Sequence, residues 1–230
     1  MSIIKKHISL LLSVCLLLCA ALLGACAAGV NTKPVYDADG RLLEPESYGR
    51  VKLGQYKGLD VTETIVTASE TALQISMEYE RENFPDMSED ELKAYCEQKL
   101  ADEMAKLAKD DAVAELVNKA IDNSSFSLNE TAVEYHFQER LKYYQDMADV
   151  YGMSIEEFAA NIVRNPDNFE SEIRLFAEQT VKLVLLSEAI VEKEKLTYDA
   201  SLTGDDAKSE MIDLASECIY KYADVNRVVN

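Results

Sequence analysis

Several residue types are scarce or missing in this chain of 230 residues. It contains no Trp and only 8 Gly, 4 Pro and 2 His. Gly and Pro interrupt regular structure, so their scarcity favours long helices joined by few turns. No Gly-rich phosphate-binding loop and no cysteine pair at metal-binding spacing occurs. The sequence therefore predicts no catalytic residue, no cofactor and no metal ligand.

Positive charge is also in short supply, with 23 Lys and Arg against 42 Asp and Glu. The resulting net charge of −19 repels nucleic acid and anionic lipid head groups. Nucleic acid is therefore not expected as a partner. We interpret the acidity mainly as an aid to solubility.

The two histidines give no sign of catalysis. His7 lies near the N-terminus, and His136 has no neighbouring Ser, Cys or second His with which to form a triad or a metal site. Paired acids such as Glu156 and Glu157 fall at predicted helix starts, where they favour the positive end of the helix dipole. Structural roles are the preferred interpretation for all of these residues.

The first 25 residues have the layout of an export signal. Lys5 and Lys6 precede an uncharged apolar run over residues 8–23, shorter than the ~20 residues of a usual spanning helix. The letters LGAC, ending at Cys26, resemble the lipobox of bacterial lipoproteins. The resemblance implies lipidation of Cys26 and a place on the extracytoplasmic face of the cell membrane. A retained membrane helix and ordinary secretion are the alternatives, and both also put the rest outside the cytoplasm.

Cysteine is otherwise rare. Cys15 and Cys19 lie in the signal, which leaves Cys96 and Cys218 on two predicted helices. These two thiols are either separate and buried or, in an oxidising compartment, joined as a disulfide.

The strongest structural signal is the run over residues 88–122. Ser88 and Glu91 form a capping box. Apolar residues then recur every three or four positions, and a helix this long measures roughly 50 Å. Further helices are predicted over residues 67–83, 130–151, 155–164, 166–195 and 205–222. The predicted fold class is all-α, with long helices preceded by a short extended segment.

The same patterns divide the chain into four parts. Residues 1–25 form the signal, and residues 26–50, with Pro and Gly but no periodicity, form a flexible tether. Residues 51–66 form the short extended segment, in which apolar residues alternate on either side of a turn. Residues 67–230 form the helical domain.

Several stretches are similar to trigger factor, the bacterial folding chaperone. LGQYKGLDV, residues 53–61, resembles the segment that leads from the ribosome-binding domain toward the prolyl-isomerase domain. Residues 110–141, 151–162 and 181–206 resemble successive parts of the family's helical arms. Related arms occur in the SurA and PrsA families of exported foldases. The resemblance implies an elongated helical chaperone domain whose arms hold unfolded clients.

The sequence departs from trigger factor in two ways, and each removes a partner or an activity that the resemblance would otherwise imply. The family's ribosome-binding loop, G-F-R-x-G-K-x-P, is absent from this sequence, so the ribosome is not an expected partner. Only residues 62–85 separate the extended segment from the arms, too few for a prolyl-isomerase domain. The chain is accordingly not expected to be an enzyme.

Aromatic and Met residues gather around the joint that follows the helix predicted over residues 130–151. Such side chains adapt to varied partners, and trigger-factor arms hold clients through apolar surface. The alternative is that these residues pack the two helices together. The predicted client-binding residues are Tyr135, Tyr143, Tyr144, Met147, Tyr151, Met153 and Phe158.

The leading functional hypothesis is a lipid-anchored, extracytoplasmic chaperone-like protein. It would bind unfolded or exported polypeptides through apolar patches between helical arms. The alternative is a non-catalytic lipoprotein that binds one specific folded partner. A prolyl isomerase with an unrecognised site is a third and less favoured interpretation.

Overall fold

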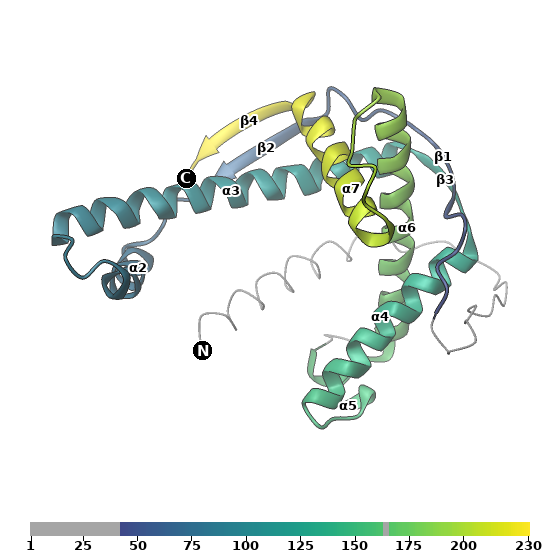
Figure 1. Ribbon diagram of the computed structural model, residues 1–230, viewed down its shortest axis with the longest axis horizontal. Coiled ribbons are helices and arrows are strands. Elements are labelled where there is room, and N and C mark those ends of the chain that lie inside the picture. Colours follow the sequence, from purple (N-terminus) through teal and green to yellow (C-terminus); the bar gives the residue numbers. More distant parts are fainter. Residues whose placement is uncertain (1–41, 163–165) are drawn as a thin grey trace. The chain divides into compact units, whose positions relative to one another are not determined.

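The computed structural model describes residues 42–162 and 166–230 of the chain. Helices dominate these ranges, and four short strands and one 3-10 turn accompany them, which confirms the predicted mostly helical fold (Figure 1). The six α-helices of the described ranges are α2 Glu70–Asn83, α3 Glu89–Asn123, α4 Glu130–Val150, α5 Ile155–Ile162, α6 Phe169–Glu194 and α7 Gly204–Lys221. No helix in the described ranges is both long and apolar enough to cross a membrane.

Local capping signals set several of these helix starts. At α3, the Ser88 side chain accepts a hydrogen bond from the backbone N–H of Glu91, and the Glu91 side chain accepts one from the backbone N–H of Ser88. Ser154 and Glu157 make the same reciprocal pair at α5, with distances of 3.2 and 2.9 Å. Each pair satisfies backbone donors that a helix start leaves free, so the predicted boundaries hold at these positions.

The strands form two separate pairs. β1, Gly49–Lys52, pairs with β3, Ser125–Leu128, and β2, Asp60–Ile65, pairs in parallel with β4, Asp224–Val229. β1 and β2 overlap the predicted extended segment, whereas β3 and β4 were not predicted from the sequence. Both missed strands are short and pair with segments far away along the chain, so no local pattern marks them.

The described chain divides into two compact units. Of the described residues, the first unit contains 42–50, 126–162 and 166–185, and the second contains 51–125 and 186–230. The division falls within α6, whose first part belongs to the first unit and whose last part belongs to the second.

In the first unit, α4 packs against the first part of α6, and α5 closes the end of this pair (Figure 1). Arg174 on α6 donates to Glu134 on α4 at 2.7 Å. Tyr48 is buried, and its carbonyl oxygen accepts the backbone N–H of Asn129 at 3.0 Å. The buried apolar side chains include Val133, Phe137, Ala148, Phe158, Ile173, Ala177 and Val181.

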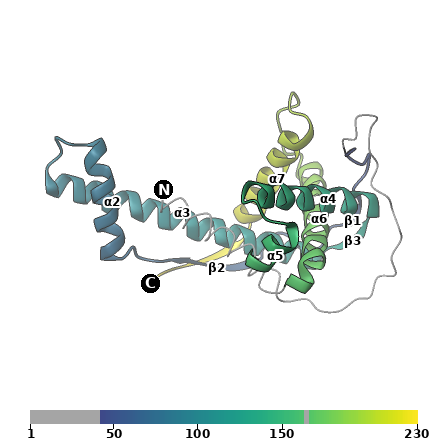
Figure 2. The same ribbon diagram turned by 90° about the horizontal axis from the view of Figure 1, so that it is seen from below.

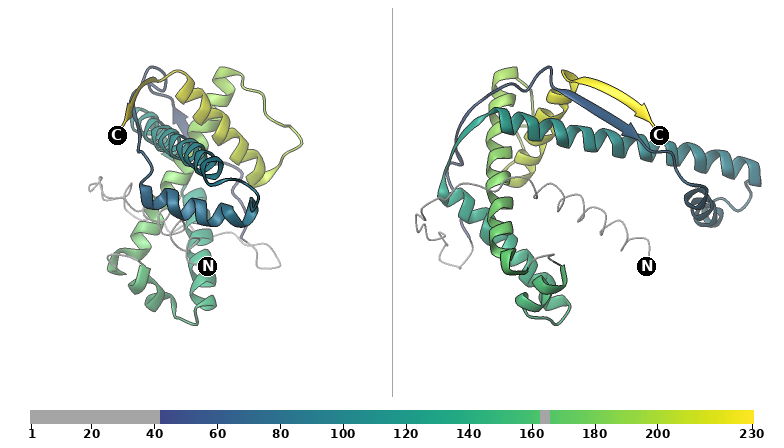
Figure 3. Two further views of the ribbon diagram at one scale, coloured as in Figure 1. Left: turned by 90° about the vertical axis from the view of Figure 1, so that its left-hand side faces the viewer. Right: turned by 180° about the vertical axis from the view of Figure 1, so that it is seen from behind.

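In the second unit, α2 packs across the first part of α3 (Figure 2). β2 and β4 lie side by side, and β2 packs on α3 (Figure 3). Cys96 and Cys218 are both buried and both are free thiols. The buried apolar side chains include Tyr56, Val61, Leu92, Leu116, Leu186, Ile190 and Ile219.

Candidate functional site

Four of the seven predicted residues come together in the first unit, around Tyr144. The Tyr144 ring centroid lies 5.6 Å from that of Tyr143 and 6.3 Å from that of Phe158. Tyr151 stacks on Phe158 with centroids 6.3 Å apart and an angle of 25° between the rings. Phe169, at the start of α6, lies 5.4 Å from Tyr144 and joins the group. We call these five side chains the aromatic cluster.

The aromatic cluster has a buried base and an exposed rim. Phe158 is buried and Tyr144 is half-buried, so these two rings hold α4, α5 and the start of α6 together. Tyr143 is 52% exposed and Tyr151 is 60% exposed. The sequence left two roles open for these residues, packing or binding, and the structure shows that the rings of the base are packed and those of the rim are exposed.

The remaining three predicted residues lie around the aromatic cluster or away from it. Met153 is partly exposed, and Asn161 Nδ2 lies 3.9 Å from its sulfur. Met147 is half-buried on α4. Tyr135 makes an edge-on ring contact with His136 at 5.1 Å. It lies nine residues before Tyr144 on the same helix, which places it roughly 13 Å away along the helix axis.

Sequence reasoning missed Arg140, which faces the aromatic cluster from α4. Its guanidinium carbon lies 4.1 Å from the ring centroid of Phe176, 5.3 Å from that of Tyr144 and 5.5 Å from that of Tyr143. A cation over aromatic faces is attracted by their quadrupoles. The spacing of Arg140, Tyr143 and Tyr144 on one helix was visible in the sequence, but the position of Phe176 was not.

A pocket of about 460 Å³ lies beside the aromatic cluster in the first unit and shares Phe169 with it. Its apolar lining comes from Leu141, Ile155, Ala159 and Phe169. Its charged lining is entirely acidic and comes from Glu156, Asp167 and Glu170. The pocket therefore combines apolar surface with negative potential.

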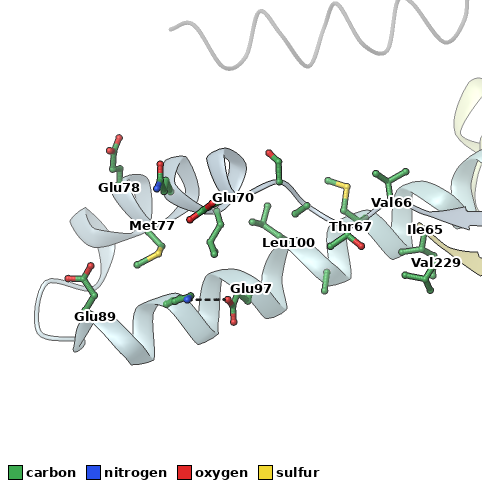
Figure 4. Close-up of a pocket in the computed structure, with 17 residues that line it drawn as sticks. Ile65, Val66, Thr67, Glu70, Met77, Glu78, Glu89, Glu97, Leu100 and Val229 are labelled. Atoms are coloured by element: carbon green, nitrogen blue, oxygen red, sulfur yellow. Dashed lines mark ion pairs between the residues drawn. The ribbon is translucent and has the colours of Figure 1, made fainter.

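A larger groove of about 910 Å³ lies in the second unit, between α2, the first half of α3 and the C-terminal ends of β2 and β4. In Figure 4, Met77 points from α2 into this groove and Leu100 faces it from α3. The other apolar lining residues are Ile65, Val66, Ala68, Leu73, Ala101, Met104 and Val229. Both helices were predicted, but the groove arises only from the way in which they pack.

Acidic side chains border this groove too, so we call it the acidic-rimmed groove. Its lining includes one cation, Lys93, whose Nζ lies 3.9 Å from Glu97 in an ion pair (Figure 4). The acidic lining residues are Glu70, Glu78, Glu89 and Glu97. A net negative rim around an apolar floor favours a ligand that combines apolar and basic groups.

An ion pair holds α2 against α3 and so fixes the two helical walls of the groove. Lys99 on α3 donates to Glu80 on α2, whose side chain is almost completely buried. Asn83 donates to the same carboxylate at 3.1 Å. Lys99, and then Asn83, lower the pKa of Glu80 below its usual value of 4.5, so the carboxylate remains charged at neutral pH.

No group of three or more His, Cys, Asp or Glu side chains in the described residues is placed to hold a metal ion. Burial raises the pKa of the Cys218 thiol, which makes it a poor nucleophile. His136 Nδ1 lies 3.1 Å from Glu139, and its buried Nε2 has no hydrogen-bond partner within the described residues. Cys26 lies outside the described residues.

The described structure is thus a mostly helical domain that presents apolar surface with an acidic border in each of its two units. The family model described as the C-terminus of the bacterial trigger factor protein matches residues 88–229. This match covers more than half of the chain, and the chain belongs to the trigger factor C-terminal family.

Individual relatives are distant. A trigger factor from Carboxydothermus hydrogenoformans is 26% identical over 107 residues, which make up 46% of this chain and 25% of that protein. The chain thus spans about a quarter of the length of this curated relative. The crystal structure of a hypothetical Mycoplasma protein superposes with a TM-score of 0.38 at 13% identity, covering 80% of this chain and 93% of the other.

Proposed function

We propose that this chain is a lipid-anchored, extracytoplasmic chaperone-like protein that binds non-native polypeptides without nucleotide, metal or covalent catalysis. Membership of the trigger factor C-terminal family supports the chaperone-like role. The observation that carries the proposal is the exposed rim of the aromatic cluster, where Tyr143 and Tyr151 stand on a base of packed rings. Rigid aromatic side chains offer a large contact area at low entropic cost.

The charge of the two units indicates which client segments bind best. The pocket beside the aromatic cluster and the acidic-rimmed groove both place carboxylates around apolar side chains. A client segment in which Lys or Arg flanks apolar residues satisfies both features. Burial of the apolar residues provides most of the affinity, and the charges favour fast association and partner choice.

We expect that removing the exposed rim weakens client binding without unfolding the domain. The variant Y143Q/Y151Q/M153Q keeps the half-buried Tyr144 and the buried Phe158 and replaces only partly or fully exposed side chains. With a chain that begins at Ala27, aggregation of a chemically unfolded model protein should be suppressed at stoichiometric amounts. Equal suppression by the variant should require at least about threefold more protein, because exposed aromatic anchors dominate such contacts.

Tyr198 provides the matched control. It is 42% exposed and lies in the loop between α6 and α7, outside both apolar surfaces. Y198Q should suppress aggregation as well as the unchanged chain does. Equal activity of the triple variant would refute the role of the rim. If the unchanged chain suppresses nothing but captures one folded protein stoichiometrically, the single-partner alternative is correct.

The lipid anchor is supported by the sequence alone. Lys5, Lys6 and the uncharged run over residues 8–23 lead directly into the LGAC motif that ends at Cys26. An anchored acyl chain would hold the helical domain near the membrane surface where exported polypeptides emerge. The net charge of −19 would meanwhile keep the domain itself from adhering to anionic lipid.

Metabolic labelling tests the anchor directly. When the full chain is expressed in a bacterium fed with an alkyne fatty acid, we expect label on the unchanged chain and none on C26S. C15S is the matched control, because Cys15 lies in the apolar run before the motif, and it should keep the label. Labelled C26S, or an unchanged chain without label, would rule out lipidation at this cysteine.

A further inference from the structure

The pairing of β4 with β2 leaves one edge of β4 open. The backbone N–H of Asp224 donates to Leu59 at 2.9 Å, and the N–H of Asn230 donates to Ile65 at 3.0 Å. In a parallel ladder these bonds alternate along the strand, so the even-numbered residues of β4 face β2. The N–H and C=O groups of the odd-numbered residues 225, 227 and 229 therefore point toward the opposite edge.

That edge is accessible and is not blocked by Pro. Within the described part of the chain, no hydrogen bond to the backbone groups of Val225, Arg227 or Val229 is found. Arg227 and Val229 are exposed, with Val229 at 70%. β4 contains no Pro and no Lys, and its one basic residue, Arg227, is paired with Glu63 of β2.

β4 is also held firmly in place. Arg227 lies opposite Glu63 in the register, and its Nε donates to Glu63 Oε1 at 3.1 Å. The Tyr220 hydroxyl on α7 donates to the other oxygen of this buried carboxylate. A strand fixed by its neighbours loses little conformational entropy when a further strand pairs with it.

The open edge leads into the acidic-rimmed groove. Ile65 and Val229 are the last paired residues of β2 and β4, and both line the end of the groove (Figure 4). An extended chain paired with β4 would therefore continue along the groove floor. There its basic residues would meet the rim formed by Glu70, Glu78, Glu89 and Glu97.

We propose that an extended segment of a non-native polypeptide adds to the open edge of β4 as a third strand and that its continuation lies in the acidic-rimmed groove. This binding mode rests on the proposed function and specifies how the second unit takes part in it. Backbone pairing accepts almost any sequence, which suits varied clients. The groove adds a preference for segments whose apolar residues are flanked by Lys or Arg.

Backbone methylation of a model peptide tests strand addition. The probe is a fluorescent peptide of alternating Val and Thr with Lys at both ends. Two further versions are N-methylated at every Val or at every Thr. Only alternate residues of an added strand bond to the edge, so one methylated version should bind like the probe. The other should bind at least about tenfold more weakly, because its hydrogen bonds are blocked.

Fluorescence anisotropy with the full chain, in a mild non-ionic detergent with protein-free blanks, gives these affinities. If both methylated peptides bind within about twofold of the probe, strand addition is refuted. A probe with Ser in place of Lys should bind several-fold more weakly at low salt. Equal binding of the Ser and Lys probes would refute the role of the acidic rim.

Two variants at one position test the edge from the protein side. V229P removes an outward N–H while leaving the bonds between β2 and β4 intact, because Pro is tolerated at such edge positions. V229T keeps the N–H and the side-chain shape but removes the apolar character. V229P should weaken probe binding about tenfold relative to V229T, at an unchanged melting temperature. Equal probe binding by V229P and V229T would overturn strand addition at β4.

Three further outcomes distinguish a failure of strand addition from a failure of the proposed function. A dimer in sedimentation experiments that V229P dissociates would show that a second copy covers the edge, which overturns the proposal. If the probe experiments fail while the Y143Q/Y151Q/M153Q variant still loses aggregation suppression, the proposed function stands without strand addition. If the probe binds as expected but the unchanged chain suppresses no aggregation, the strand addition stands and the general chaperone role fails.

Discussion

Replacement of Gly54 by Ala should lower the free energy of unfolding by about 3 kcal/mol, the upper range for overpacking. A Cβ atom at this position would lie 1.9 Å from the carbonyl oxygen of Asn123 and 2.4 Å from its carbonyl carbon. Both atoms belong to the backbone at the C-terminal end of α3 and cannot move aside as a flexible side chain could. The segment containing Gly54 must therefore shift away from α3.

The shift should spread because this segment is attached at several points. The N–H of Gly54 donates to Ser124 Oγ at 3.0 Å, and Asn123 Nδ2 donates to the carbonyl of Gln55 at 3.0 Å. Tyr56 is buried, and its hydroxyl donates to Glu194 at 2.6 Å. Burial, together with the carboxylate of Glu194, raises the pKa of the Tyr56 phenol. Displacement of the segment weakens all three hydrogen bonds.

Urea denaturation followed by circular dichroism measures the loss, with G152A as the control. Gly152 has a φ of +65°, and no atom lies within 4 Å of the place that a Cβ would take, so Ala there meets only backbone strain. Its cost should be about 1 kcal/mol. If G54A costs no more than G152A, the close approach of this segment to α3 is wrong.

Replacement of Phe158 by Ala should unfold α5 and abolish the binding surface of the first unit. Phe158 is only 4% exposed and lies between Tyr144 and Tyr151, and truncating a buried Phe typically costs about 3 kcal/mol or more. α5 has eight residues, too few for a helix to persist without tertiary contacts. Loss of its main anchor should release α5 while the second unit remains folded.

Hydrogen exchange and aggregation suppression together test this expectation. In F158A, the amides of α5 should exchange rapidly, those of α3 should remain protected, and suppression should fall at least as far as in Y143Q/Y151Q/M153Q. F158L retains most of the volume and should cost less than about 1.5 kcal/mol. If α5 remains protected in F158A while suppression is lost, Phe158 contacts the client directly and is not an anchor.

The start of α2 shows how a distant contact changes a boundary suggested by the local pattern. The sequence predicted a helix from residue 67, but α2 begins at Glu70, after Ser69 takes the N-cap position and accepts the N–H of Ala72. The N–H and the hydroxyl of Thr67 both donate to the carbonyl oxygen of Asn230 at 2.9 Å. Residue 67 therefore continues the pairing of β2 with the C-terminal strand, which no local pattern could reveal.

In the aromatic cluster, too, some features follow from the local sequence and others depend on distant contacts. The sequence predicted a shared site for four of these residues because they lie close together around one predicted joint: Tyr143, Tyr144, Tyr151 and Phe158. It could not tell which of these side chains are buried and which are exposed, since burial depends on where α6 lies against them. Phe169, which completes the cluster from another helix, had no local signal at all.

The helices and most of their ends follow from the amino-acid sequence, because caps and apolar periodicity act over a few residues. The capping pairs at Ser88 and Ser154 and the long run of α3 are examples. Tertiary packing, in contrast, sets which apolar residues remain exposed, where the acidic-rimmed groove lies and which strand edge is open. These features depend on contacts between segments far apart in the chain, such as β2 with β4, whose register is set by packing on α3 and α7 rather than by local preference.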